Sequence, residues 1–461
     1  MSKLSTSEVY DEVVNSIMKI SSKDKISDII WKQFYKNKSK CVKDCGKKLK
    51  IIILNAPCNG FGDLIFALKL FGYLKEWYGA DVTLATTLEK GLLDLGANPK
   101  DTVGIVGSGD TQCRKFKGLK LNKAIPKQDL ILVAPMQIDF SPNLNDVRGL
   151  LSYANSLNTF YFSEYNDKLN KKFTFNTGVG KDRDGILLTN HIKSSKIPSN
   201  LKNPYALIYV AGTLEGVNDC IISFVEMIVK KYYKKHKHLD IVIPSWFVNQ
   251  KLDKKIKAAF SKYYPNITQL IKNKHNPNKT DESYISIGHK TDNKLTFRCD
   301  ILPVANKVMM TLMEKSIDDI LLTGDQSITD AVSCCYKKNI FYQIAPWKRN
   351  LAEELSKEMP NSYLKSGKTS CGSLKAVNYH SNYDNFRKKW DFRTRSKSKM
   401  DAIILSMLAI KNDKKLYDLS VNSIGSLTSI KNKLKSLKPK SKSKSSKIKS
   451  RKPKSKSRKH K

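Results

Sequence analysis

Short apolar runs alternate with amphipathic helical segments along most of this chain. The first run, residues 49–57, is nearly continuous and is typical of a strand buried on both faces of a parallel sheet. A helical segment at 64–78 carries apolar side chains at helical spacing and ends at Gly79, and a second apolar run follows at 81–86. This order predicts a βαβ unit with parallel, right-handed pairing.

The same alternation continues in two series, separated by a polar stretch at 166–203 that predicts a domain junction. The first series predicts strands at 103–106, 129–134 and 159–162 and helices at 88–95 and 144–157. The second series predicts strands at 205–210, 239–243, 284–287, 320–322 and 340–344 and helices at 217–235, 249–263, 303–315 and 326–338. Further helices are expected at 347–359 and 399–411, and a loop at 272–282. Alternating strands and helices throughout favour an α/β fold with two Rossmann-like domains.

Both ends of the chain differ from this body. Residues 1–48 carry apolar side chains at helical spacing and end in a Lys-rich linker, whereas the chain from about residue 424 is a Ser/Lys repeat. Such a repeat cannot bury apolar surface and is expected to be disordered. The predicted organisation is a helical leader at 1–48, Rossmann-like domains at 49–203 and at 204–423 with closing helices, and a disordered basic tail at 424–461.

The net charge of +41 is shared unevenly along the chain. Residues 431–461 hold 16 Lys or Arg and no acid, and the remaining 430 residues carry +25. Many body lysines are expected on solvated helix faces, and the abundance of Asn, Lys, Ile and Tyr fits an AT-rich genome. A basic body still favours anionic ligands over cationic ones. The tail predicts non-specific, salt-sensitive contact with nucleic acid through 431–461, with a localisation signal or a solubilising tail as the alternatives.

Several signals for membranes, export and metals are missing from the sequence. No apolar run reaches the length of a transmembrane segment, and the polar N-terminus has no secretory signal, so a cytoplasmic location is expected (host cytoplasm or virion if the chain is viral). The nine cysteines are odd in number and scattered, which predicts reduced thiols. Cys41 and Cys45 have near-ligand spacing but no second pair nearby, so no metal site is expected.

Residues 319–333 hold the strongest candidate for a binding site. A short apolar run breaks at Gly324 and restarts as a helix with Asp325, Ser327 and Thr329 in its first turn. The free backbone N–H groups and positive dipole end of such a helix form an anion site, and phosphate is the usual occupant. The same polar residues could also be ordinary helix caps, so a structural αβ unit stays open.

Three stretches resemble enzymes of the glycosyltransferase-B fold. Asn59-Gly60-Phe61-Gly62-Asp63 resembles the Gly-rich acceptor-side loop of heptosyltransferase-like enzymes and of the N-acetylglucosaminyltransferase of peptidoglycan synthesis. Two later stretches resemble the donor-binding half of these enzymes, and their matching residues are Gly212, Thr213, Thr323, Gly324, Asp325, Ser327 and Asp330. The family acid that meets the donor sugar is usually Glu, whereas Asp330 stands here.

The resemblance implies two Rossmann-like domains facing a central cleft, with the acceptor bound by the first domain and a nucleotide-sugar donor by the second. No cofactor or metal is implied, because basic side chains and helix dipoles would offset the charge of the leaving phosphate. The basic candidates are Arg298, Lys348 and Arg349. Asp63 is the first candidate for the catalytic base and His191 the second, although Asp63 could also be only an N-cap.

The function predicted from the sequence is therefore sugar transfer from a nucleotide-sugar to an acceptor that the sequence does not identify, without a metal ion. The alternative is a non-catalytic two-domain protein that binds nucleic acid through its basic tail, for example in a virion or a replication compartment. A third interpretation is another Rossmann-type enzyme, such as a sugar epimerase.

Overall fold

A computed structural model describes residues 49–407 of the chain, with gaps. The gaps are 59–60, 108–115, 138–141, 156–157, 170–173, 190–194, 213–215, 248–252, 274–275, 277–278, 289–291, 336–337, 359–375, 380–383, 398, 402 and 405–406. The predicted leader at 1–48 and the predicted tail at 424–461 both lie outside the described residues.

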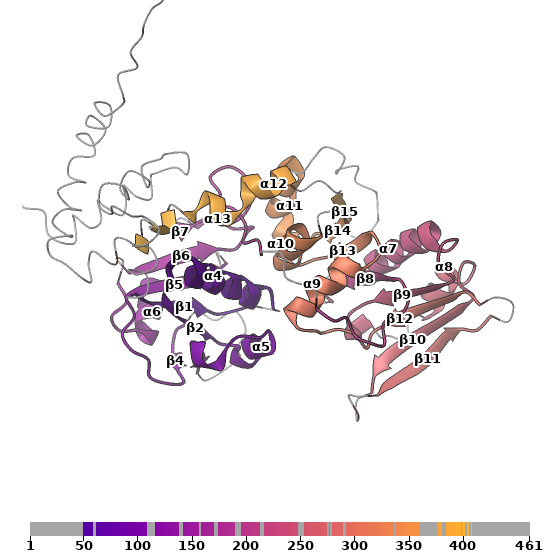
Figure 1. Ribbon diagram of the computed structural model, residues 1–461, viewed down its shortest axis with the longest axis horizontal. Helices are drawn as coiled ribbons and strands as arrows, with labels where there is room; N and C mark the ends of the chain where they lie inside the picture. Colours follow the sequence, from indigo (N-terminus) through magenta and orange to yellow (C-terminus); the bar gives the residue numbers. More distant parts are fainter. Residues whose placement is uncertain are drawn as a thin grey trace, which may run out of the picture.

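The described N-terminal domain is a seven-stranded sheet with strand order β4-β3-β2-β1-β5-β6-β7 (Figure 1). The strands are β1 Lys50–Asn55, β2 Asp81–Thr86, β3 Thr102–Val106, β4 Lys120–Leu121, β5 Leu130–Met136, β6 Thr159–Ser163 and β7 Thr174–Phe175. The helices are α4 Gly62–Tyr78, α5 Glu89–Asp94, α6 Leu144–Leu150 and the 3-10 helix η1 Pro99–Asp101. Because β1 lies between β2 and β5, the strand order reverses at its carboxyl end, where open α/β sheets bind ligands.

The predicted first strand is buried on both faces. Ile51 and Ile53 belong to the core under α4, whereas Ile52 and Leu54 belong to the core on the opposite face of the sheet. Helices on both faces of a parallel sheet require this continuous apolar run, and β1 is paired in parallel with both of its neighbours.

The described C-terminal domain is an eight-stranded sheet with strand order β11-β10-β12-β9-β8-β13-β14-β15. Its strands are β8 Tyr205–Tyr209, β9 His238–Val242, β10 Asn266–Lys272, β11 Thr280–Ser286, β12 Lys294–Arg298, β13 Asp319–Leu322, β14 Asn339–Gln343 and β15 Ala376–Tyr379. Its helices are α7 Val217–Tyr232, α8 Asp253–Phe260, α9 Asn306–Lys315, α10 Asp325–Cys334 and α11 Arg349–Glu358, with 3-10 helices η3 Ser245–Phe247 and η5 Pro346–Lys348. The strand order reverses between β8 and β13, so a second switch point lies at their carboxyl ends.

The predicted α/β architecture of two Rossmann-like domains is confirmed, and most predicted elements are present. Five strands were not predicted: the short β4 and β7, the edge strand β15, and β10 and β12. In β10 and β12, polar residues such as Thr268 and Thr296 alternate with the apolar ones. The strand predicted at 284–287 is the end of a longer β11, which also replaces the last residues of the loop predicted at 272–282.

The two domains pack against each other through α4 and α10 (Figure 1). One continuous apolar core includes Leu70 of α4 and Ile328 and Ala331 of α10. Helix α10 lies between the C-terminal sheet and α4, so all its residues after Asp325 are buried, including the polar ones. The central cleft implied by the resemblance is therefore filled by protein at this helix pair.

After the second sheet the chain returns to the N-terminal domain as α12 Asp384–Trp390 and α13 Phe392–Arg395 (Figure 1). The Phe392 ring stacks on Tyr73 of α4 with ring centroids 6.2 Å apart. The Ile186 amide donates to the Trp390 carbonyl at 2.7 Å, which fixes this return to the N-terminal domain.

Four of the described cysteines are free and buried: Cys220, Cys299, Cys334 and Cys335. Cys58 is disulfide-bonded, so the expectation of reduced thiols is wrong for this cysteine. Across the described part of the chain, every helix is too short or too polar to cross a bilayer.

Candidate functional site

The start of α4 places Asp63 at the carboxyl end of β1. Its Oδ2 atom accepts a hydrogen bond from the Cys58 amide at 2.9 Å, and the Asn55 side chain donates to the Asp63 carbonyl at 3.2 Å. The Asn55 side chain also donates to the Ala134 carbonyl of β5 at 3.0 Å, which anchors this turn across the first switch point. The N-cap of α4 is Phe61, so the N-cap interpretation of Asp63 does not describe its contacts.

The surroundings of Asp63 shift its titration toward neutral pH. Burial raises the pKa of its carboxyl group to about 7, and the negative charge of Glu164 adds to this shift. The Cys58 amide and the Lys348 ammonium lower this pKa by less, and Asp325 raises it slightly. The Asp63 residue as a whole keeps partial exposure to solvent. A carboxyl group with such a pKa suits proton transfer near neutral pH.

Lys348 joins the carboxyl ends of both sheets. Its Nζ atom lies 2.7 Å from Glu164, which follows β6, and 2.7 Å from Asp325, which begins α10 after β13. The Tyr342 hydroxyl donates to the other oxygen of Asp325 at 3.2 Å. Burial raises the pKa of Asp325, and Lys348 opposes that rise. Together with Asp63, these residues place three carboxyl groups around one lysine at the domain boundary.

A second ion pair crosses the domain boundary between α4 and α10. The Lys69 Nζ atom lies 2.6 Å from Asp330, 3.1 Å from the Gln326 side-chain oxygen and 3.0 Å from the Thr329 hydroxyl. Both charged side chains are buried. Asp330, which the resemblance places at the donor sugar, therefore has an interdomain partner in the structure.

The second switch point brings Gly212 and Thr323 together. The Ala211 amide lies 3.4 Å from the Thr323 hydroxyl, which in turn donates to the Gln343 side-chain oxygen. A Cβ atom at Gly212 would lie 2.7 Å from the Trp246 indole, so glycine is required here by this ring. The Trp246 side chain is itself 40% exposed at the carboxyl end of the sheet.

The other two glycines of the candidate site have more space around them. A Cβ atom at Gly62 would lie 3.9 Å from the nearest side-chain atom, in Gln326, and one at Gly324 would lie 3.3 Å from the Ser327 hydroxyl. Gly324 is exposed as the N-cap of α10, and Ser327 lies buried in the first turn of that helix. The first turn of α10 therefore has an open backbone at Gly324 and a charged side chain, Asp325, directed at Lys348.

Arg298 is not brought to this site. It ends β12, three strands from β13, which corresponds to roughly 14 Å at the usual strand spacing. Its guanidinium forms two hydrogen bonds of 2.8 Å with Asp300 and a longer one of 3.3 Å with Asp240. These buried partners give Arg298 a structural role in the C-terminal sheet.

Four predicted site residues lie outside the described residues: Asn59, Gly60, His191 and Thr213. Their proposed roles stay predictions.

Two residues of the site were not singled out from the sequence. Glu164 directly follows a predicted strand, so the rule that selected Asp63 could have selected it too. Lys69 lies inside an amphipathic helix, and no sequence signal distinguishes it from the exposed lysines of other helices.

No protein-family model and no curated protein matches the sequence. Solved structures of glycosyltransferases show a low similarity to the chain, each across 82% of its length. An alpha-glucosyltransferase in complex with UDP and a 13-mer DNA containing a HMU base is 10% identical, with a TM-score of 0.36 and 99% of that chain covered. The glycosyltransferase of kitacinnamycin is 11% identical, with a TM-score of 0.37 and 94% covered.

A trehalose-6-phosphate synthase is 9% identical, with a TM-score of 0.32 and 99% of that chain covered. Because all three TM-scores lie below 0.5, we infer neither substrate nor acceptor from these similarities.

Proposed function

We propose that this chain is a glycosyltransferase that moves a sugar from a nucleotide-sugar donor to an acceptor hydroxyl. The observation that carries the proposal is that the carboxyl ends of both sheets contribute charged side chains to one cluster. Asp63 and Glu164 follow strands of the N-terminal sheet, and Asp325 and Lys348 follow strands of the C-terminal sheet. Ligands of open α/β sheets bind at such carboxyl ends, so two domains arranged in this way can hold two substrates against each other.

The C-terminal side of the site has the features that a diphosphate requires. The first turn of α10 presents backbone N–H groups and the positive end of the helix dipole beside the exposed Gly324. Lys348 adds a cation that is now paired with Asp325 and Glu164. In our proposal the donor diphosphate takes the place of Asp325 as the partner of Lys348.

The N-terminal side of the site supplies the base. In an inverting transfer, the Asp63 carboxylate accepts the proton of the acceptor hydroxyl as its oxygen bonds to the anomeric carbon of the donor. The bond from that carbon to the diphosphate breaks, and the electron pair leaves with the phosphate oxygen. Lys348 and the α10 dipole offset the charge that develops on this leaving group. The stereochemical course is not part of the proposal.

Nucleoside diphosphates test the donor side directly. We expect uridine or guanosine diphosphate to raise the melting temperature of the full chain, because a ligand that binds only the folded state at 100 times its Kd adds about 2.7 kcal/mol of stability. Calorimetric titration gives the affinity, and the parent nucleoside is the matched control without phosphates. If no nucleoside diphosphate produces heat or a thermal shift, the proposal is wrong.

Sugar transfer is expected to continue without a divalent metal ion. In the described part of the chain, no cluster of three His, Cys, Asp or Glu side chains is arranged to hold a metal ion. The sequence Asp182-Arg183-Asp184 resembles a metal-binding pair of aspartates, but Asp184 contacts Lys399 at 3.2 Å and accepts from the Asn176 amide at 2.6 Å. We expect the transfer rate to change by less than about twofold in excess EDTA, and a loss that Mg²⁺ or Mn²⁺ restores would contradict metal independence.

A further inference from the structure

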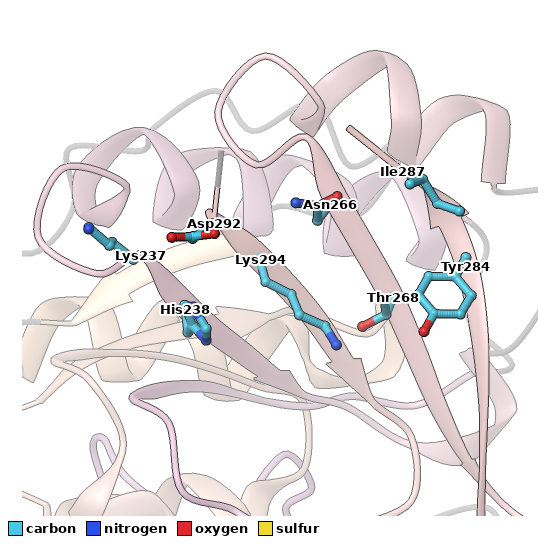
Figure 2. A pocket seen from close by; sticks show the side chains of 8 residues that line it. All are labelled: Lys237, His238, Asn266, Thr268, Tyr284, Ile287, Asp292 and Lys294. Carbon is cyan, nitrogen blue, oxygen red and sulfur yellow. The ribbon is translucent and has the colours of Figure 1, made fainter. Parts of the chain in front are cut away.

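A hollow lies at the opposite end of the C-terminal sheet from the candidate active site. It has a volume of about 530 Å³ and is open to solvent (Figure 2). His238 and Lys294 begin the parallel strands β9 and β12, so the hollow lies at their amino ends, whereas Asp325 and Lys348 follow the carboxyl ends of β13 and β14. The whole length of the sheet separates the two places, so the hollow is not part of the active site.

One wall of the hollow is an exposed apolar surface. Tyr284 of β11 is 61% exposed and Ile287 is 63% exposed, more than any other large apolar side chain among the described residues. Figure 2 shows Tyr284 on the edge strand β11 beside Thr268 of β10, and Ile287 directly after the end of β11. Large apolar side chains that are exposed together commonly mark a binding surface.

The other wall and its border are basic. Lys237 and His238 lie across the hollow from Tyr284, with Lys294 between them (Figure 2). Residues 227–239, which lead into β9, contain five Lys and two His and no acid. Within this segment Lys230 pairs with Glu226 and Lys231 pairs with Asp319, whereas the later Lys234, Lys235 and Lys237 are exposed.

Two acidic residues lie near these cations, but they do not neutralise all of the positive charge. Glu282 pairs with Lys294 at 2.9 Å, and Asp292 belongs to the lining of the hollow. Lys237 of the lining is exposed, and Lys234 and Lys235, which precede it closely in the chain, are exposed as well, so the local charge stays positive. An anionic ligand is therefore the charge-complementary occupant.

We propose that this hollow binds single-stranded nucleic acid, with one base on the Tyr284 ring and the flanking phosphates on Lys237 and the exposed lysines just before it in the chain. An exposed aromatic face beside cations is the combination that single strands use, because each nucleotide offers a base to stack and a phosphate to pair. A duplex hides its base faces, so it would use only the charges. The basic residues 431–461 can bind the same strand as a second contact, which raises the affinity for longer strands.

Photo-crosslinking of the full chain locates the contact independently of the basic tail. The probe is a single-stranded 12-mer that carries 5-iododeoxyuridine, which forms photoproducts with aromatic side chains. We expect mass spectrometry to find the crosslink at Tyr284 in the tryptic peptide 280–290. Crosslinks confined to residues outside 227–298 would overturn the proposal.

Substitutions separate stacking from charge. Tyr284→Ala is expected to lower the crosslink yield at this peptide by about tenfold. It should lower by the same factor the affinity for a strand too short to contact the hollow and residues 431–461 together. Tyr284→Phe keeps the aromatic ring, so both values should stay unchanged. Lys234→Glu with Lys237→Glu is expected to weaken binding and to reduce its dependence on salt. The matched control is Lys120→Glu with Lys123→Glu, which makes the same charge change on the exposed surface of the other domain.

Two competing occupants give different results. If inorganic phosphate or a mononucleotide displaces the 12-mer at the same molar concentration as unlabelled 12-mer, the hollow takes a small phosphate compound and the proposal is wrong. If Tyr284→Ala and the lysine variant both bind the 12-mer like the control variant, the surface belongs to another kind of partner and the proposal is also wrong.

Discussion

Replacing Asp63 with Asn is expected to lower the rate of sugar transfer by about 100-fold or more at pH 8, because a positioned base contributes roughly 10²–10⁴-fold. The substitution keeps the size of the side chain and removes its ability to accept a proton. Donor affinity should stay within a few fold, because Asp63 lies on the acceptor side. The measurement is the steady-state rate at saturating donor, with Asp101→Asn as a matched change of a carboxylate that pairs with Lys75 elsewhere.

The pH dependence gives an independent readout of the same residue. Because burial raises the pKa of Asp63 to about 7, the basic form is populated above that pH, and the wild-type rate should rise as pH passes through 7. Folding stability runs in the opposite direction: the native state keeps this proton up to about pH 7, whereas the unfolded chain loses it near its ordinary value of 3.8. Stability should therefore fall as pH rises from 4 to 7, and Asp63→Asn should remove this part of the fall. A wild-type rate that is flat through pH 7 would exclude Asp63 as the base.

Replacing Lys348 with Met is expected to lower the free energy of unfolding by about 3–5 kcal/mol at pH 8, which is the usual cost of removing one partner from a buried ion pair. Glu164 and Asp325 would then share a buried site without a cation, and each would favour its protonated form. The loss of stability should shrink as pH falls toward 5, because protonation removes the unpaired charges. Chemical denaturation at several pH values measures both effects.

The control for this prediction is Lys75→Met, which breaks the more exposed ion pair with Asp101 and should cost no more than about 1 kcal/mol. A double variant, Lys348→Met with Asp325→Asn, should recover part of the lost stability by removing one of the unpaired charges. If Lys348→Met is no less stable than Lys75→Met at every pH, the lysine does not hold the two domains together.

The fold was predictable where burial leaves a pattern in the sequence. The run that forms β1 is apolar on both faces because helices or loops cover both sides of the N-terminal sheet, so its position was predicted within two residues. Strands β10 and β12 lack this pattern, since they carry buried polar residues: the Thr268 and Thr296 hydroxyls lie 3.3 Å apart and form a hydrogen bond. A short strand in which polar residues are buried beside apolar ones is hard to distinguish from a polar loop in a single sequence.

The candidate site was predictable only in its local part. Asp63 and Asp325 each follow a predicted strand, and that local signal was sufficient to select them. In the structure the charge of Lys348 acts on both residues: it pairs with Asp325 and lowers the pKa of Asp63. This arrangement depends on packing between residues far apart in the chain, which sequence spacing does not predict. The same limit explains Asp330: the resemblance placed it at the donor sugar, whereas in the structure it pairs with Lys69 of the other domain.

The central claim is that the carboxyl ends of both sheets form one nucleotide-sugar site, and a crystal structure of the full chain with a bound nucleoside diphosphate tests it most directly. The account predicts the diphosphate beside Gly324 and the first turn of α10, with Lys348 turned from Asp325 to a phosphate oxygen. A nucleotide bound elsewhere, such as in the hollow beside Tyr284, with the Lys348–Asp325 pair intact, would contradict it.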